Sequence, residues 1–249
     1  MTRVVIIGAG GQARDTAWLI REINAEIQRE ARGLPSRAES REPKDGRGLP
    51  SRSREGSGEG ISDRAPIELL GFIVSDLAKL GPHDSEVLGD ETWLDAHRAE
   101  FDAFVLGIGT PAARLRVAAN LSERFPEKDW PTLIHPRVEL DRASATFGRG
   151  VMIGAGVVGS VNLVFDDFAL INLGVTLGHE AHFGRGVVVN HNASIAGGVV
   201  LERGVLVGSS AAVLQYLRVG DGATVGAGAV VTKHVPPRET WVGVPARLR

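Results

Sequence analysis

The stretch "GVTLGHEAHFGRGVVVNHNASIAGGVVLERGVLVG", residues 174–208, repeats with a period of six residues. Each sixth residue is large and apolar, and the series in this stretch reads Leu177, Phe183, Val189, Ile195, Leu201 and Val207. The same register extends from Phe147 to Val231, where Gly159 is the one position without a large side chain.

The residues around this series are also periodic. The residue two places earlier is small or aliphatic, and the residue directly after it is often Gly, Asn or Asp. Six residues turn an α-helix through about 600°, so a helix cannot keep this series on one face. A six-residue period is typical of a β-helix, whose short strands form the sides and whose glycines form the corners. Three hexads per coil predict about five coils over these positions.

The hexads and the chain ending "VGAGAVVTKHVPPRETWVGVPARLR", residues 225–249, resemble the left-handed parallel β-helix of hexapeptide-repeat acyltransferases. The resemblance covers residues 131–249 and implies a homotrimer with acetyl-CoA bound between neighbouring coils at subunit boundaries. In those enzymes the segment that matches "GVPA", residues 243–246, lies near the coenzyme A arm. On this resemblance, the expected contacts with acetyl-CoA in the corners and tail are Gly197, Gly208, Gly226, Lys233, Gly243 and Pro245.

The first 130 residues have a different pattern, which predicts a small Rossmann-like domain. "RVVIIGAGGQARDTAWLIREI", residues 3–23, indicates a buried strand, a glycine turn and a helix, and Gly8, Gly10 and Ala13 satisfy G-x-G-x-x-G/A. The stretches 67–76 and 101–121 predict a second strand and a third strand followed by a helix. In a parallel sheet of this kind the ligand binds at the carboxyl ends of the strands. The candidate sugar- or nucleotide-binding residues are therefore Gly10, Gly11, Gln12, Ser75, Asp76, Gly109 and Thr110. A tight strand–helix turn without a ligand is the alternative for the glycine motif.

Residues 30–65 form an insertion with little apolar content. The segment contains "RGLPSR" twice, at 32–37 and 47–52, and its arginines alternate with acidic residues. Such a composition cannot bury enough surface to offset the entropy of ordering, so we expect a disordered insertion that can be deleted without loss of activity.

Composition excludes several function classes. The chain has 249 residues, a formal net charge of −2 and no cysteine, which excludes disulfides, thiolate zinc sites and a cysteine nucleophile. The charge gives no general attraction to nucleic acid or to an anionic membrane. The N-terminal apolar run is too short for a signal peptide or a membrane span, so we expect a cytoplasmic protein without membrane insertion.

The "GAGG" turn, the linker "TLIHP" at 132–136 and the hexads together resemble the sialic-acid O-acetyltransferase family. Its relatives include UDP-amino-sugar N-acetyltransferases of the bacillosamine pathway and perosamine N-acetyltransferases. The resemblance implies that the N-terminal domain binds a sugar or nucleotide sugar and that the β-helix binds acetyl-CoA. It also implies a general base in the motif "GH[DE]", here His179, with Glu180 as the acidic neighbour.

This chemistry suits an imidazole. An amine or hydroxyl that attacks a thioester must lose a proton, and a neutral histidine accepts protons near pH 7. A neighbouring carboxylate orients the ring, and a corner N–H group can stabilise the oxyanion. The sequence does not distinguish an amine acceptor from a hydroxyl acceptor.

The chain departs from the family at two positions. The family commonly has a second histidine nine residues after the first, where this chain has Val188, so His182 or His191 is the alternative contact with acetyl-CoA. Relatives often have histidine after "GAGG", where this chain has Gln12.

Three other functions stay open on the sequence. One is a non-catalytic, trimeric sugar-nucleotide-binding or scaffold protein. Another is a metal enzyme of the γ-carbonic-anhydrase kind, although the histidine spacings do not match its three-histidine site and we expect no metal. The third is an NAD-linked oxidoreductase, for which the N-terminal unit is too small.

Overall fold

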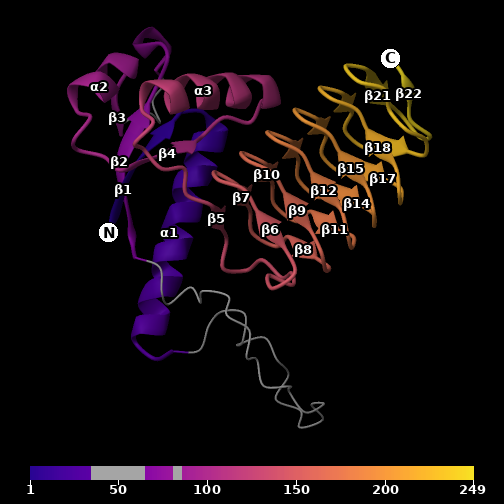
Figure 1. The fold of residues 1–249 in the computed structure, drawn as a ribbon, viewed down its shortest axis with the longest axis horizontal. Helices are drawn as coiled ribbons and strands as arrows, with labels where there is room; N and C mark the ends of the chain where they lie inside the picture. Colours follow the sequence, from indigo (N-terminus) through magenta and orange to yellow (C-terminus); the bar gives the residue numbers. More distant parts are fainter. Residues whose placement is uncertain (35–64, 81–85) are drawn as a thin grey trace.

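The computed structural model describes residues 1–34, 65–80 and 86–249. Figure 1 shows an N-terminal α/β domain beside the first coils of a long β-helix that extends away from it to the C-terminus. Most of the expected insertion at 30–65 lies outside the described residues.

The N-terminal domain is a four-stranded parallel sheet with the strand order β3-β2-β1-β4. Strand β1 forms the centre because its Val4, Val5 and Ile6 are fully buried between two apolar layers. The predicted strands and helices are confirmed, and β3 and α2 are short elements that the sequence pattern did not indicate. The elements are β1 (Thr2–Ile7), α1 (Gly11–Ala31), β2 (Ile67–Ile73), the 3₁₀ helix η3 (Leu77–Lys79), β3 (Val87–Gly89), α2 (Glu91–Ala96), β4 (Ala103–Leu106) and α3 (Pro111–Arg124).

Two predicted boundaries are wrong. Strand β2 ends at Ile73 rather than at Asp76, whose carboxylate instead accepts a hydrogen bond from the N–H of Ala78 and caps η3. Helix α1 continues to Ala31, past the expected start of the insertion, because Ile23 and Ile27 prolong its buried face.

The β-helix has three parallel sheets whose short strands repeat along the chain. Sheet 1 contains β5 (Leu133–Ile134), β7 (Met152–Ile153), β10 (Leu170–Ile171), β13 (Val188–Val189), β16 (Leu206–Val207), β19 (Thr224–Val225), β21 (Thr240–Val242) and β22 (Arg247–Leu248), the last antiparallel to β21. Sheet 2 contains β8 (Val158–Gly159), β11 (Thr176–Leu177), β14 (Ser194–Ile195), β17 (Ala212–Val213) and β20 (Val230–Val231). Sheet 3 contains β6 (Thr146–Phe147), β9 (Val164–Phe165), β12 (His182–Phe183), β15 (Val200–Leu201) and β18 (Arg218–Val219).

The predicted hexad register is confirmed. The second residue of every strand from β6 to β20 is a position of the predicted series. Apart from Gly159, its side chain points into one continuous core with the residue two places before it. The rings of Phe147, Phe165 and Phe183 stack in successive coils of sheet 3. Residues 18 apart therefore lie one coil apart on the same side.

The corner glycines serve two different purposes. A Cβ on Gly148 would lie 2.5 Å from the backbone nitrogen of Asp167, so this class of glycine, directly after the strand, is needed for close stacking of coils. Gly150 and Gly156 belong to a second class, two residues later, with left-handed φ values of 65° and 72°. The turn itself is therefore made by the second class, and not by the glycines that the hexad pattern singled out.

The two domains share a core at their junction. The apolar face of α1 packs on the outer face of sheet 1, where Leu170 and Val188 are buried against it (Figure 1). Arg114 of α3 is fully buried and donates hydrogen bonds to the carbonyl oxygens of Leu106 and Ile108 in the N-terminal domain and of Phe168 in the β-helix. Burial lowers the pKa of Arg114 to about 9. These contacts hold the carboxyl end of β4 against the β-helix.

Candidate active site

Two corners of the β-helix carry the polar residues of interest. The histidine corner, between sheets 2 and 3, comprises residues 160–162, 178–180, 196–198, 214–216 and 232–234. The asparagine corner, between sheets 1 and 2, comprises residues 154–156, 172–174, 190–192, 208–210 and 226–228. Each residue of a corner repeats 18 positions later in the next coil.

His179 lies on the histidine corner with half of its side chain exposed. Its Nδ1 atom is 3.6 Å from Oε2 of Glu180, a residue whose left-handed φ of 60° turns the chain at this corner. On the other side of the ring, a Cβ on Gly197 would lie 2.5 Å from Nε2. The imidazole thus has a carboxylate near Nδ1 and its Nε2 edge against the glycine of the next coil. This orientation leaves Nε2 as the atom that can accept a proton from a ligand.

The other two histidines have different surroundings. His182 lies on the outer face of sheet 3, where its Nε2 is 3.0 Å from Oδ2 of Asp166. His191 lies on the asparagine corner, one strand beyond β12. The structure therefore separates the three neighbouring histidines onto two corners and one face. Within the described ranges, no three histidine, aspartate or glutamate side chains are arranged to hold a metal ion.

The expected acetyl-CoA contacts divide between the two corners. Gly197 and Lys233 are in register with His179, whereas Gly208 and Gly226 are in register with Asn172. The tail folds back over the last coil, where the N–H of Val230 donates to the carbonyl of Gly243, two residues before Pro245. Val188 does not fit a coenzyme contact, because it has no exposed surface and packs beneath α1.

The carboxyl edge of the N-terminal sheet brings most of the predicted sugar-binding residues together. Gly10 caps α1, Thr110 caps α3, and a Cβ on Gly109 would lie 3.6 Å from Oε1 of Gln12. Added Cβ atoms on Gly10 and Gly11 would have no neighbour within 4 Å, so a ligand can reach this backbone. Ser75 and Asp76 follow β2 at the same edge. The N-terminal turns of two helices at one edge favour a phosphate group.

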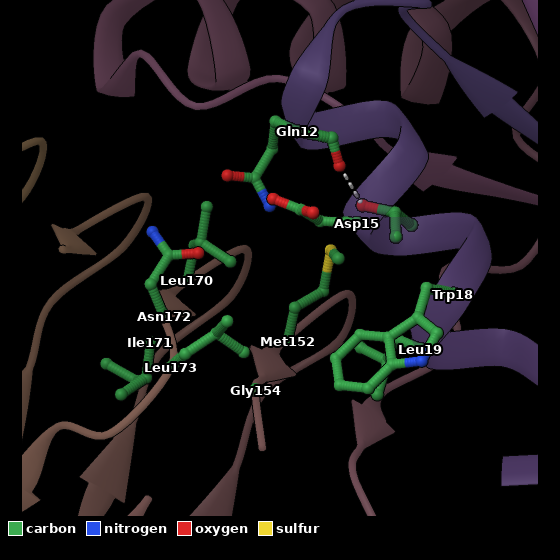
Figure 2. A pocket seen from close by; sticks show the side chains of 11 residues that line it. Gln12, Asp15, Trp18, Leu19, Met152, Gly154, Leu170, Ile171, Asn172 and Leu173 are labelled. Atoms are coloured by element: carbon green, nitrogen blue, oxygen red, sulfur yellow. Dashed lines mark hydrogen bonds between the residues drawn. The ribbon is translucent and has the colours of Figure 1, made fainter. Parts of the chain in front are cut away.

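A pocket joins this edge to the asparagine corner (Figure 2). Gln12 and Asp15 of α1 face Asn172 across it, above a floor that includes Met152 and Leu170. The amide nitrogen of Asn172 donates to Oδ1 of Asn190 at 3.1 Å, which turns its own oxygen toward α1. We name this hollow the α1 pocket; its remaining lining residues are Thr16, Trp18, Leu19, Gly154, Ile171 and Leu173.

Sequence reasoning missed Asn172, Asp15 and Trp18. In the sequence, Asn172 is one of many Gly, Asn or Asp residues that follow a large hexad residue, and Asp15 and Trp18 lie within the predicted helix without a motif of their own. These three residues come together because α1 packs on sheet 1. Neither the hexad pattern nor the helix pattern predicts that packing.

No protein-family model matches the chain, and the search of curated proteins found no match. Solved structures are similar over its whole length. PerB from Caulobacter crescentus, solved in complex with CoA and GDP-perosamine, is 23% identical with a TM-score of 0.69, covering 100% of this chain and 98% of that one. WeeI from Acinetobacter baumannii is 22% identical with a TM-score of 0.71 and full coverage of both chains. The acetyltransferase domain of PglB from Neisseria gonorrhoeae is 19% identical with a TM-score of 0.58 and full coverage of both.

This likeness shows the fold. The chain is a left-handed parallel β-helix joined to a small N-terminal α/β domain, as the hexads and the "GAGG" turn predict. Among the described helices, none has both the length and the apolar character needed to cross a membrane.

Proposed function

We propose that the chain is an acetyl-CoA-dependent acetyltransferase that acts on an amino or hydroxyl group of a sugar or nucleotide sugar. The observation that carries this proposal is His179, whose imidazole has Glu180 near Nδ1 and Gly197 against Nε2 on an exposed corner of the β-helix. The structural neighbours support the same chemistry. PerB was solved with CoA and GDP-perosamine, also as a variant with a histidine replaced by alanine, and the PglB domain was solved with acetyl coenzyme A.

In this reaction the acceptor atom attacks the thioester carbonyl carbon of acetyl-CoA. Nε2 of His179 accepts the proton that the acceptor loses, and the carboxylate of Glu180 stabilises the imidazolium. When the C–S bond breaks, the imidazolium returns the proton to the sulfur, and free coenzyme A leaves. We assign the oxyanion contact to the backbone N–H of Gly197, because this residue lies beside the His179 ring.

The histidine corner also suits the coenzyme. Lys233 is exposed and lies three coils beyond His179 on the same corner. Since neighbouring strands are about 4.8 Å apart, the separation is about 14 Å, which is on the order of the length of a pantetheine arm. Lys233 is therefore in a position to bind the coenzyme phosphates while the thioester lies at His179.

We place the acceptor in the α1 pocket. Its polar rim of Gln12, Asp15 and Asn172, beside the ring of Trp18, offers hydrogen-bonding groups to a hexose that lies over the pocket, and the carboxyl edge of the N-terminal sheet next to Gln12 suits a nucleotide diphosphate. The pocket lies on the asparagine corner, one side of the β-helix away from His179 of the same chain. We therefore propose a homotrimer in which the pocket of one subunit faces His179 of the next subunit. We also propose that the protein acts in the cytoplasm, where acetyl-CoA is available.

The test is a screen of acceptors with acetyl-CoA, measured by release of free thiol. The panel contains UDP- and GDP-linked 4-amino sugars, the matching 4-hydroxy sugars, and sialic acid. We expect thiol release that requires an acceptor and that His179→Ala reduces. A wild-type protein that binds a nucleotide sugar but releases no thiol with any acceptor would contradict the proposal and favour a scaffold.

A further inference from the structure

One residue of the histidine corner, two coils beyond His179, has an unusual backbone conformation. Tyr216 has a left-handed φ of 57°, the same conformation as Asn162, Glu180 and Gly198 in the preceding coils of this corner. An aromatic residue is rarely found there, because its Cβ crowds the backbone. Such strained residues concentrate at functional sites.

Burial does not compensate this strain in Tyr216. Phe168 also has a positive φ, of 63°, but its ring is fully buried and packs edge-on against Trp130. The Tyr216 side chain, by contrast, is 66% exposed. The exposed ring of Tyr216 is therefore open to a ligand at this corner.

The coil that precedes Tyr216 has glycines at the two positions that face the rings of Tyr216 and His179. A Cβ on Gly198 would collide with the Tyr216 ring, and a Cβ on Gly197 would collide with the His179 ring. The two rings lie edge-on with centroids 6.5 Å apart. A ligand atom that is hydrogen-bonded to Nε2 lies about 4 Å from the imidazole centroid, so groups attached to that atom come within reach of the tyrosine.

The surroundings of Tyr216 identify the chemical class of the ligand. Leu214, in the same coil as Tyr216, and Val161, one coil below His179 on the same corner, are each 42% exposed. These apolar side chains suit an acyl chain on a thioester, whereas a polyhydroxylated sugar has its polar partners in the α1 pocket.

We propose that Tyr216 is the wall of the acyl site and sets the length of the acyl chain that the enzyme accepts. This inference rests on the proposed acyltransferase function. The ring closes the space above Gly198, where the terminal carbons of an acyl group longer than acetyl would extend.

The test needs no acceptor. Dissociation constants of acetyl-CoA, butyryl-CoA and free CoA are measured calorimetrically for the wild type, Tyr216→Phe and Tyr216→Gly. Glycine keeps the left-handed backbone, so Tyr216→Gly removes the ring without unfolding the corner. Asn162→Gly, in the same conformation three coils below, is the matched control.

We expect the wild type, Tyr216→Phe and Asn162→Gly to bind acetyl-CoA at least about tenfold more tightly than butyryl-CoA, since two methylenes without room cost this much or more. In Tyr216→Gly the ratio should fall to about one. If Tyr216→Gly keeps the wild-type ratio of butyryl-CoA to acetyl-CoA dissociation constants, the inference is wrong. If that ratio is kept and sedimentation also shows that the variant no longer assembles, the ring belongs to a subunit contact instead. If the wild type binds no coenzyme A species, the proposed function itself fails, and the inference fails with it.

Discussion

The histidine corner and the asparagine corner are built from the same hexad, yet they differ in what covers them. Helix α1 docks beside the asparagine corner, so Asn172 is 5% exposed and faces a pocket. No described element covers the histidine corner, where His179 is half exposed between apolar side chains. Under the proposed function, the covered corner binds the sugar and the exposed corner carries out proton transfer. The difference in cover is the reason we propose that a complete active site combines the two corners from neighbouring subunits.

The largest expected effect is at the histidine corner. His179→Ala should lower kcat about 10²–10⁴-fold, because positioned proton transfer contributes that much. The dissociation constant of acetyl-CoA should change little, since the proposed coenzyme contacts are made by other residues. Steady-state kinetics and calorimetry measure the two quantities. Near-wild-type turnover in this variant would remove His179 from the mechanism.

The asparagine corner should respond differently. Asn172→Ala should raise the KM for the acceptor about tenfold with a smaller change in kcat, because it deletes one hydrogen-bonding group of the α1 pocket. Asn192→Gly is the control, since Asn192 lies one coil further on the same corner, has a left-handed φ of 58° and does not line the pocket. A change confined to the KM for acetyl-CoA would place the sugar elsewhere.

A smaller effect is expected for the neighbour of the base. Glu180→Gln should lower kcat by about two- to fivefold, because its 3.6 Å contact with Nδ1 is solvent-exposed and exposed pairs contribute about 1 kcal/mol or less. The measurement is kcat against pH at saturating substrates. A loss as large as that of His179→Ala would mean that the carboxylate takes part in proton transfer directly.

The smallest effect is expected for His182→Ala. His182 hydrogen-bonds Asp166 on the face of sheet 3 and belongs to neither corner. We expect kcat within about twofold of the wild type and, since such surface pairs contribute little, an unchanged melting temperature. If kcat of His182→Ala fell a hundredfold instead, the assignment of sugar binding and proton transfer to the two corners would be wrong.

The sequence predicts the candidate residues of the histidine corner, but it does not predict most of the residues that form the α1 pocket at the asparagine corner. The hexad register is local, so residues six and eighteen positions apart predict the coils, the corners and the placing of His179 and Glu180. The α1 pocket depends on how a helix from one domain packs on a sheet of another, which includes the buried Arg114 and the buried Val188. No periodicity in either segment encodes that packing. Asn172 was therefore visible as a corner residue but not as part of a site.

The central claim, that the two corners act together only across a subunit boundary, is tested most directly by mixing two defective chains. His179→Ala chains and Gln12→Trp chains, in which the indole fills the α1 pocket, are co-expressed with different tags and purified for mixed assemblies. Each variant alone should be inactive, and a mixture of two histidine variants, His179→Ala with His179→Gln, is the control without intact sites. In a closed trimer that contains both kinds of chain, one of the three boundaries joins an intact pocket to an intact His179, so we expect mixed assemblies of the first kind to recover about a third of the wild-type acetyl transfer. Mixed assemblies that stay as inactive as the control, or a wild-type monomer with full activity, would contradict the claim.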